Sequence, residues 1–246
     1  MRNLWLITKE DFKNLILNPM WIFYSLGFPI LMMLILGFLT QDSYGVEISS
    51  YDYYGITIMI YFLFNSGMTS ANAFMEERIK KPNMRIIYSP GAIADIYLSK
   101  IISSTLFTSL FYAIDMLFFG FVIHVDFGPI GHIAVLFLLY NLVAVTMGIM
   151  FCCIFKTEEI TNQLQSVVVN LLCILGGVLF SLDGYGTMVR RISDISPVKW
   201  LVKGCFQMIY DQDYHLFFPL IVGGILAVIV MMLICRFTFH KEDCIC

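Results

Sequence analysis

Residues 75–100 read MEERIKKPNMRIIYSPGAIADIYLSK, a polar stretch between two long apolar runs. The stretch holds five of the chain's fifteen lysines and arginines. Loops of membrane proteins that are rich in Lys and Arg remain on the cytoplasmic side. This stretch is also longer than a simple connection needs to be, and it has a helix-like middle followed by the turn Ser89-Pro90-Gly91. We therefore expect residues 76–100 to form a folded cytoplasmic segment that contacts a soluble partner.

The composition outside this stretch is that of a membrane protein. Of the 246 residues, 59% are hydrophobic and 13% are charged, whereas a soluble domain has about 25% charged residues. We expect an all-α polytopic membrane protein that forms a single domain over residues 1–246. Basic residues form no patch away from the loops that flank apolar runs, so the sequence gives no reason to expect nucleic-acid binding.

Six apolar runs are close to the length of about 20 residues that a helix needs to cross a bilayer. We predict membrane-spanning helices at residues 20–40, 54–75, 101–123, 132–155, 161–182 and 217–236. Residues 183–216, between the last two, are too polar to span and too apolar for a free loop. We expect them to form a short re-entrant or interfacial pair of helices on the outer side, with an ordinary surface helix as the alternative.

Residues 1–18 have the periodicity of an amphipathic helix. One side of the helix carries Leu4, Trp5, Thr8, Phe12, Leu15 and Ile16. The other side carries Lys9, Glu10, Asp11, Lys13 and Asn14. We predict that this helix lies in the cytoplasmic interface of the membrane. A continuation of the first span is the alternative, but Pro19 interrupts helical hydrogen bonding at the junction.

The distribution of Lys and Arg gives the orientation. With both termini in the cytoplasm, the inner segments hold eleven of these residues and the outer segments hold four. All four outer residues, Arg190, Arg191, Lys199 and Lys203, belong to the segment 183–216. This bias supports cytoplasmic N- and C-termini.

Polar residues recur at helical spacing in two of the predicted spans. The second span carries Asn65, Thr69, Asn72 and, at its end, Glu76. The fifth span carries Gln163, Ser166, Asn170, Cys173, Gly177 and Ser181. Such faces are unfavourable against lipid. They indicate either helix packing through small and hydrogen-bonding residues or the lining of a substrate path.

Asp115 lies well inside the third predicted span. An acidic residue within a membrane is a functional candidate. Ser104, Thr108 and Tyr112 fall on the same side of the helix and would be within reach as hydrogen-bond donors. Two interpretations stay open for Asp115, a structural polar clamp and a role in proton or ion coupling.

The motifs of common enzymes and nucleotide-binding proteins are missing. The sequence has no G-x-x-x-x-G-K-[ST] phosphate loop, and it has neither H-E-x-x-H nor G-x-S-x-G. Its four histidines show no ligand spacing. We expect a chain that is not an enzyme, binds no cofactor or metal, and does not bind ATP itself.

The order of these features resembles the permease subunit of type-2 ATP-binding-cassette (ABC) exporters. The resemblance covers nearly the whole chain, and four local matches carry it. They are Asn18-Pro19 at the entry to the first span, Glu77-Arg78 after the second, the turn Ser89-Pro90-Gly91, and Lys100 at the start of the third.

The resemblance implies a set of partners and sites. A second permease subunit, identical or related, would complete the path, and two copies of a separate ABC ATPase would bind ATP and Mg²⁺ below it. Residues 76–100 would be the coupling helix, with its contact residues Glu76, Glu77, Arg78, Arg85, Ser89, Pro90 and Gly91. The second and fifth spans would line the path through Asn65, Thr69, Asn72, Gln163, Ser166, Asn170, Gly177 and Ser181, and residues 184–213 would form the outer gate.

The expected function is ATP-driven export across the cytoplasmic membrane of a bacterium. The predicted path is polar, uncharged and rich in Met, Phe and Tyr, which favours an amphipathic or hydrophobic cargo such as an antimicrobial peptide, a drug or a lipid-like molecule. Export of a polysaccharide or glycolipid by the same mechanism is one alternative. An ion-gradient-driven secondary transporter that uses Asp115 is another.

Overall fold

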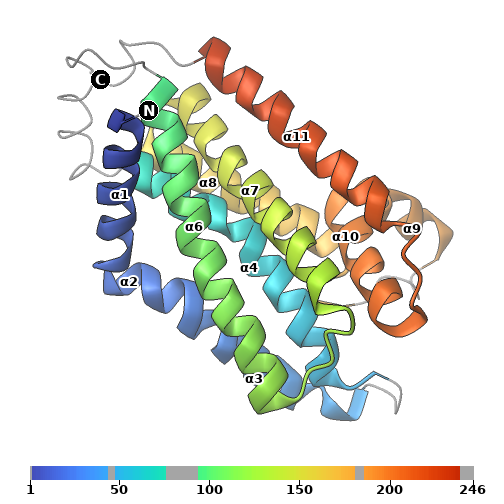
Figure 1. The fold of residues 1–246 in the computed structure, drawn as a ribbon. Helices are drawn as coiled ribbons and strands as arrows, with labels where there is room; N and C mark the ends of the chain where they lie inside the picture. Colours follow the sequence, from blue (N-terminus) through green and yellow to red (C-terminus); the bar gives the residue numbers. More distant parts are fainter. Residues whose placement is uncertain (1, 44–47, 76–93, 181–185, 239–246) are drawn as a thin grey trace.

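A computed structural model describes residues 2–43, 48–75, 94–180 and 186–238 (Figure 1). All regular structure in these ranges is helical, which confirms the predicted all-α class. The helices are α1 (Arg2–Ile16), α2 (Pro19–Ile22), α3 (Phe28–Leu39), α4 (Ser50–Met75), α6 (Ala94–Phe118), α7 (Ile130–Phe155), α8 (Glu158–Leu175), α9 (Thr187–Ser193), α10 (Pro197–Phe206) and α11 (Phe217–Thr238). Single π-helical turns at Phe23–Gly27, Phe119–Ile123 and Gln207–Asp211 extend α2, α6 and α10.

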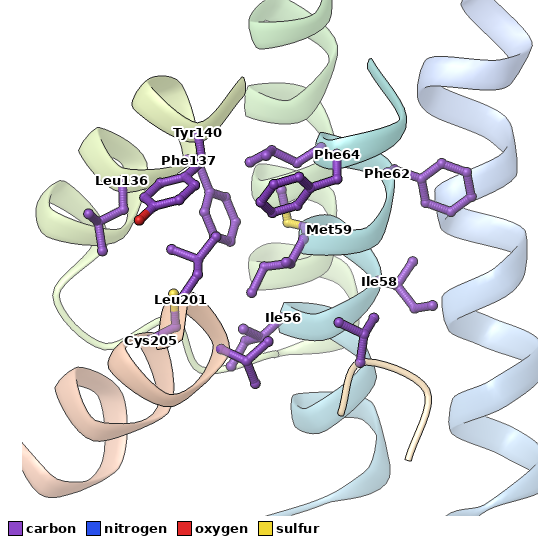
Figure 2. Packing of buried hydrophobic residues seen from close by; sticks show 14 of the residues in the cluster. Ile56, Ile58, Met59, Phe62, Phe64, Leu136, Phe137, Tyr140, Leu201 and Cys205 are labelled. Atoms are coloured by element: carbon purple, nitrogen blue, oxygen red, sulfur yellow. The ribbon is translucent and has the colours of Figure 1, made fainter. Parts of the chain in front are cut away.

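Helix α4 is the centre of the bundle. It packs against α3, α6, α7, α8 and α10, and 20 of its 26 residues are buried. Figure 2 shows Met59 and Phe64 on the side of α4 that faces Phe137 and Tyr140 of α7. Because protein rather than lipid surrounds α4, this helix can carry Asn, Ser and Gly without exposing them to hydrocarbon.

Four helical stretches in the described ranges are long and apolar enough to cross a membrane. They are Pro19–Leu39, Asp95–Ile123, Ile130–Phe155 and Phe217–Thr238. They agree with four of the six predicted spans. The other two predictions, 54–75 and 161–182, fall on α4 and α8, which are less apolar, so the count of six stays a prediction.

The fifth predicted span is also too long at its C-terminal end. Helix α8 ends at Leu175, and Gly177 adopts a φ of 72°. A residue in this left-handed region ends a helix, and glycine adopts it without strain. The left-handed conformation of Gly177 therefore ends α8 before the predicted end at residue 182.

Helix α1 confirms the predicted N-terminal helix but corrects its orientation. Asp11, predicted on the polar side, is only 8% exposed, and Trp5, predicted on the apolar side, is 66% exposed. The reason is that α1 packs along α6. The buried side of α1 is therefore set by contacts of Thr8, Asp11 and Leu15 with protein, and not by the apolar arc alone.

Helices α9 and α10 form at the end of the bundle away from α1 (Figure 1). Together with the π-helical turn Gln207–Asp211 they occupy most of the segment 183–216, so the expected pair of short helices is present. Ser193 Oγ and Ser196 Oγ donate hydrogen bonds to the carbonyl oxygens of Leu175 and Leu172, at 2.5 Å and 2.7 Å. These bonds attach the pair to the C-terminal turn of α8, and its re-entry into the membrane stays a prediction.

Candidate substrate path and coupling elements

Polar residues of α4 and α8 pair along the line of contact between the two helices, here called the α4–α8 seam, and each pair contains one residue of a predicted polar stripe. Tyr61 Oη of α4 donates a hydrogen bond of 2.9 Å to Asn170 Oδ1 of α8. Asn162 Nδ2 donates to Asn72 Oδ1 at 3.0 Å, and Asn72 Nδ2 donates back at 3.4 Å. Polar residues at helical spacing on the two helices thus pair with each other.

The individual path residues differ in their surroundings. Asn65 donates from Nδ2 to the Tyr61 carbonyl oxygen at 2.8 Å, and Asn170 Nδ2 donates to Ser166 Oγ at 3.2 Å. Thr69 is fully buried, and its hydroxyl has no hydrogen-bond partner among the described residues. Gln163 is exposed, and no hydrogen bond to α4 is found for it among the described residues.

Gly177 lies just after the C-terminal end of α8, where its carbonyl oxygen accepts a 2.5 Å hydrogen bond from Tyr53 Oη. Ser181 lies outside the described residues. Three seam residues were not predicted, namely Tyr61, Asn162 and Gln165. A polar stripe that starts at Asn162 and continues in steps of four through Ser166 to Asn170 would have predicted Asn162, the partner of Asn72.

Helices α4 and α7 approach each other at two glycines. A Cβ atom on Gly148 would lie 2.2 Å from the Gly67 carbonyl oxygen and 2.6 Å from Ser70 Oγ. Ser70 Oγ also donates a 2.9 Å hydrogen bond to the Val145 carbonyl oxygen. Small residues at such crossings let two backbones come close, as is usual between helices in membranes. This crossing fixes α4, and with it one side of the seam.

Asp115 is fully buried in α6, and neither of its carboxylate oxygens has a hydrogen-bond partner among the described residues. The predicted polar clamp is not formed. Tyr112 Oη instead donates to the Phe62 carbonyl oxygen at 2.6 Å. Thr108 Oγ1 hydrogen-bonds Asn141 of α7, whose Nδ2 lies 2.8 Å from both Thr108 Oγ1 and Ser109 Oγ. The sequence analysis did not predict Asn141 as the hydrogen-bond partner of Thr108.

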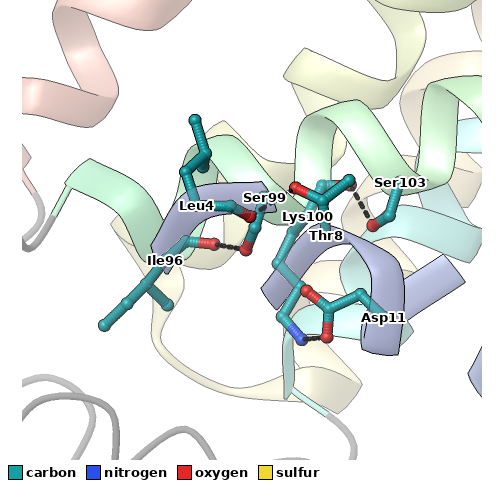
Figure 3. Close-up of polar contacts among 7 residues, drawn as sticks. All are labelled: Leu4, Thr8, Asp11, Ile96, Ser99, Lys100 and Ser103. Carbon is teal, nitrogen blue, oxygen red and sulfur yellow. Dashed lines mark hydrogen bonds and ion pairs between the residues drawn. The ribbon is translucent and has the colours of Figure 1, made fainter. Parts of the chain in front are cut away.

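An ion pair between Lys100 and Asp11 connects α6 to α1 (Figure 3). Lys100 is 1% exposed and Asp11 is 8% exposed. Burial raises the pKa of the Asp11 carboxyl, and the Lys100 ammonium beside it opposes this shift. Removing one member of a buried ion pair leaves an uncompensated charge. The pair therefore fastens α1 to the N-terminal part of α6.

The predicted coupling residues lie outside the described ranges. They are Glu76, Glu77, Arg78, Arg85, Ser89, Pro90 and Gly91. What the structure does describe is the two ends of their segment. Residue 75 ends α4, the central helix with one side of the seam, and residue 94 begins α6, to which α1 is fastened.

A family model described as "ABC-2 type transporter" matches residues 2–210. No curated protein sequence matches the chain. The matched residues run from α1 to the end of α10 and include both helices of the α4–α8 seam, the segment 76–93, and the Asp11–Lys100 pair.

Proposed function

The chain belongs to the ABC-2 type transporter family, and on this basis we propose that it is the permease subunit of an ATP-driven exporter. The family match confirms the resemblance expected from the sequence. The match and the apolar helices indicate that the chain is a multi-pass membrane protein of an ABC transporter, which works with an ATPase partner. In our proposal the transporter lies in the cytoplasmic membrane of a bacterium, with both termini of this chain in the cytoplasm.

The complete transporter would contain two permease subunits, identical or related, and two copies of the ATPase. ATP and Mg²⁺ would be bound by the ATPase, because this chain has no phosphate loop. The permease would then have no enzymatic activity and no cofactor of its own. The observation that carries the proposal is the α4–α8 seam, a line of paired polar side chains along the central helix of an otherwise apolar bundle.

The seam has the chemistry of a path for uncharged or amphipathic molecules. Tyr61, Met68 and Asn72 are the half-buried positions along this part of α4, while most of the helix is buried. On α8, Asn162, Ser166 and Asn170 are also half-buried. A second permease subunit placed over this side would enclose these uncharged groups. We propose an amphipathic or hydrophobic cargo, such as a peptide, drug or lipid-like molecule, with a polysaccharide or glycolipid as the alternative.

Coupling would pass through residues 76–93 into two helices at once. Closure of the ATPase pair would displace this segment, which continues directly into α4 and α6. Because Asp11 and Lys100 join α1 to α6, α1 would move with α6. The relative motion of α4 against α8 would then open the seam toward the outside.

Reversal of two basic charges in the coupling segment tests this proposal. We expect the double variant Arg78→Glu, Arg85→Glu to recover at least about tenfold less ATPase on co-purification, because like charges across a contact are strongly unfavourable. The matched control is Arg190→Glu, Arg191→Glu in α9, at the end of the bundle away from α1. Equal recovery of the ATPase with both double variants would contradict the assignment of residues 76–93 as the docking segment.

A secondary transporter driven by an ion gradient is the second candidate, and one observation favours it. Asp115 is buried within the span Asp95–Ile123 without a hydrogen-bond partner among the described residues, and such acids often carry protons or ions. In our proposal the chemistry of Asp115 is not needed, so Asp115→Asn, which keeps its size, should retain transport within about twofold. Transport by reconstituted vesicles with ATP, or with an ion gradient alone, would separate the two. Loss of transport in Asp115→Asn, together with dependence on the gradient, would favour the secondary transporter.

A further inference from the structure

A cavity of about 510 Å³ lies among α9, α10, the glycine turn after α8 and the first turns of α4. Its size is within the range of pockets that bind small organic molecules, roughly 300–1,000 Å³. Helices α9 and α10, which line the cavity, lie at the end of the bundle away from α1 (Figure 1), so the cavity is on the outer side in the proposed orientation. The resemblance would make residues 184–213 the outer gate, but neither it nor the family match assigns a ligand to this cavity.

One wall of the cavity is a series of aromatic rings. The ring centroids of Tyr53 and Phe206 are 5.5 Å apart, and those of Phe206 and Tyr210 are 5.8 Å apart with an interplanar angle of 15°. The hydrogen bond from Tyr53 Oη to the Gly177 carbonyl oxygen holds the first ring in place. This wall offers a continuous apolar surface to a hydrocarbon chain.

The lining of the cavity also carries basic groups. Arg190, Lys199 and Lys203 all line it. Lys199 Nζ is 2.9 Å from Asp194 Oδ1, while Lys203 Nζ lies 5.6 Å from the centroid of the Trp200 ring. Asp194 and Asp211 are the acidic residues of the described lining, so cations outnumber carboxylates there by three to two. Since Lys199 is paired, Arg190 and Lys203 are the groups best placed to receive an anion.

We propose that this cavity binds an anionic amphiphile, a phospholipid with an acidic headgroup from the outer leaflet. Its phosphate would contact Arg190 and Lys203, whose cationic donors make short charge-assisted hydrogen bonds to phosphate oxygens. Its acyl chain would lie along Tyr53, Phe206 and Tyr210. The same assignment gives a role to Arg190 and Lys203, two of the four basic residues of the segment 183–216, whose place on the outer side the bias of Lys and Arg toward the cytoplasm leaves unexplained. This binding goes beyond the proposed export function and needs no ATP.

The fluorescence of Trp200 provides a direct test. Trp200 is 39% exposed at the cavity, and Trp5 and Trp21 are the other two tryptophans of the chain. In the variant Trp5→Phe, Trp21→Phe, purified in a neutral detergent, dihexanoyl phosphatidylglycerol should produce a saturable change in Trp200 emission. Dihexanoyl phosphatidylcholine, with the same chains and no net charge, should bind at least about tenfold more weakly, as should inorganic phosphate, which has no chains.

Charge removal at the site completes the test. Arg190→Gln with Lys203→Gln in the same background should weaken phosphatidylglycerol binding about tenfold. Both side chains are exposed, so the fold should tolerate the change, and a melting curve checks this. Lys9→Gln with Lys13→Gln, at exposed positions of α1, is the matched control and should leave binding unchanged. Equal binding of the two lipids, an equal response to phosphate alone, or unchanged binding after loss of Arg190 and Lys203 would each overturn the proposal.

Discussion

Replacing Lys100 by methionine is expected to lower the free energy of unfolding by about 3–5 kcal/mol, the usual effect of breaking a buried ion pair from one side. The substitution would leave the Asp11 carboxylate, 8% exposed, without the cation that compensates its burial. Methionine retains most of the length and apolar volume of the lysine stem, so loss of packing contributes little. Chemical or thermal unfolding of the purified protein, with both proteins in the same detergent, measures the difference.

The double variant Asp11→Leu, Lys100→Met separates the ion pair from its individual charges. Removing both charges should restore most of the lost stability, because a buried pair and an apolar pair of similar volume are often nearly equal in free energy. Lys13→Met is the matched control, since Lys13 lies on the same helix as Asp11 and is exposed. It should change stability by no more than about 0.5 kcal/mol. If Lys100→Met were no less stable than Lys13→Met, the pair would not fasten α1 to α6.

The same variants bear on coupling. If α1 moves with α6 during transport, Lys100→Met should reduce ATP-driven transport more than it reduces the amount of folded protein. The double variant Asp11→Leu, Lys100→Met restores packing without the ionic connection, so it shows whether the contact or the charge transmits the motion. Transport is compared per molecule of folded protein, which removes the effect of stability on expression.

The helices at the periphery of the bundle were predictable because contact with lipid requires a continuous apolar sequence. Leu31 and Phe38 of α3 and Leu226 of α11 are exposed large hydrophobic residues, as expected of helices in contact with lipid. Helix α4 is less apolar because other helices surround it. Hydropathy alone does not show that a helix is buried among other helices. The end of α8 depends on the backbone conformation of Gly177, which an apolar run does not reveal.

The candidate path was predictable in part for a related reason. Steps of three and four residues place Asn65, Thr69 and Asn72 on one side of α4 without knowledge of any neighbour. The pairing of Asp11 with Lys100 depends instead on a contact between residues 89 positions apart. No periodicity connects such positions, and for Asp11 the amphipathic pattern indicated the exposed side.

The closest crossing of α4 and α7 gives the second large effect. Gly148→Ala should lower the free energy of unfolding by about 3 kcal/mol, at the upper end of the usual range for overpacking. The added Cβ would lie 2.2 Å from the Gly67 carbonyl oxygen, which belongs to the backbone and cannot rotate away. The two helices would have to separate, and the hydrogen bond from Ser70 Oγ to the Val145 carbonyl oxygen would lengthen.

The same substitution at Gly223 of α11 is the control, because a Cβ there would meet no atom within 4 Å. Alanine also favours a helix by up to about 1 kcal/mol over glycine, so Gly223→Ala should be as stable as the parent or slightly more stable. Thermal unfolding of the two variants in one detergent gives the comparison, and equal midpoints would mean that the crossing is not tightly packed.

Gly67→Ala separates the contact of α4 with α7 from its contact with α8. Its Cβ would lie 2.4 Å from the Ala144 carbonyl oxygen of α7 but 1.8 Å from Gln165 Nε2 of α8, a side-chain end that can move. Gly67→Ala should therefore disturb the α4–α8 seam as well as the α4–α7 crossing, and it should reduce transport more than Gly148→Ala does for the same loss of stability.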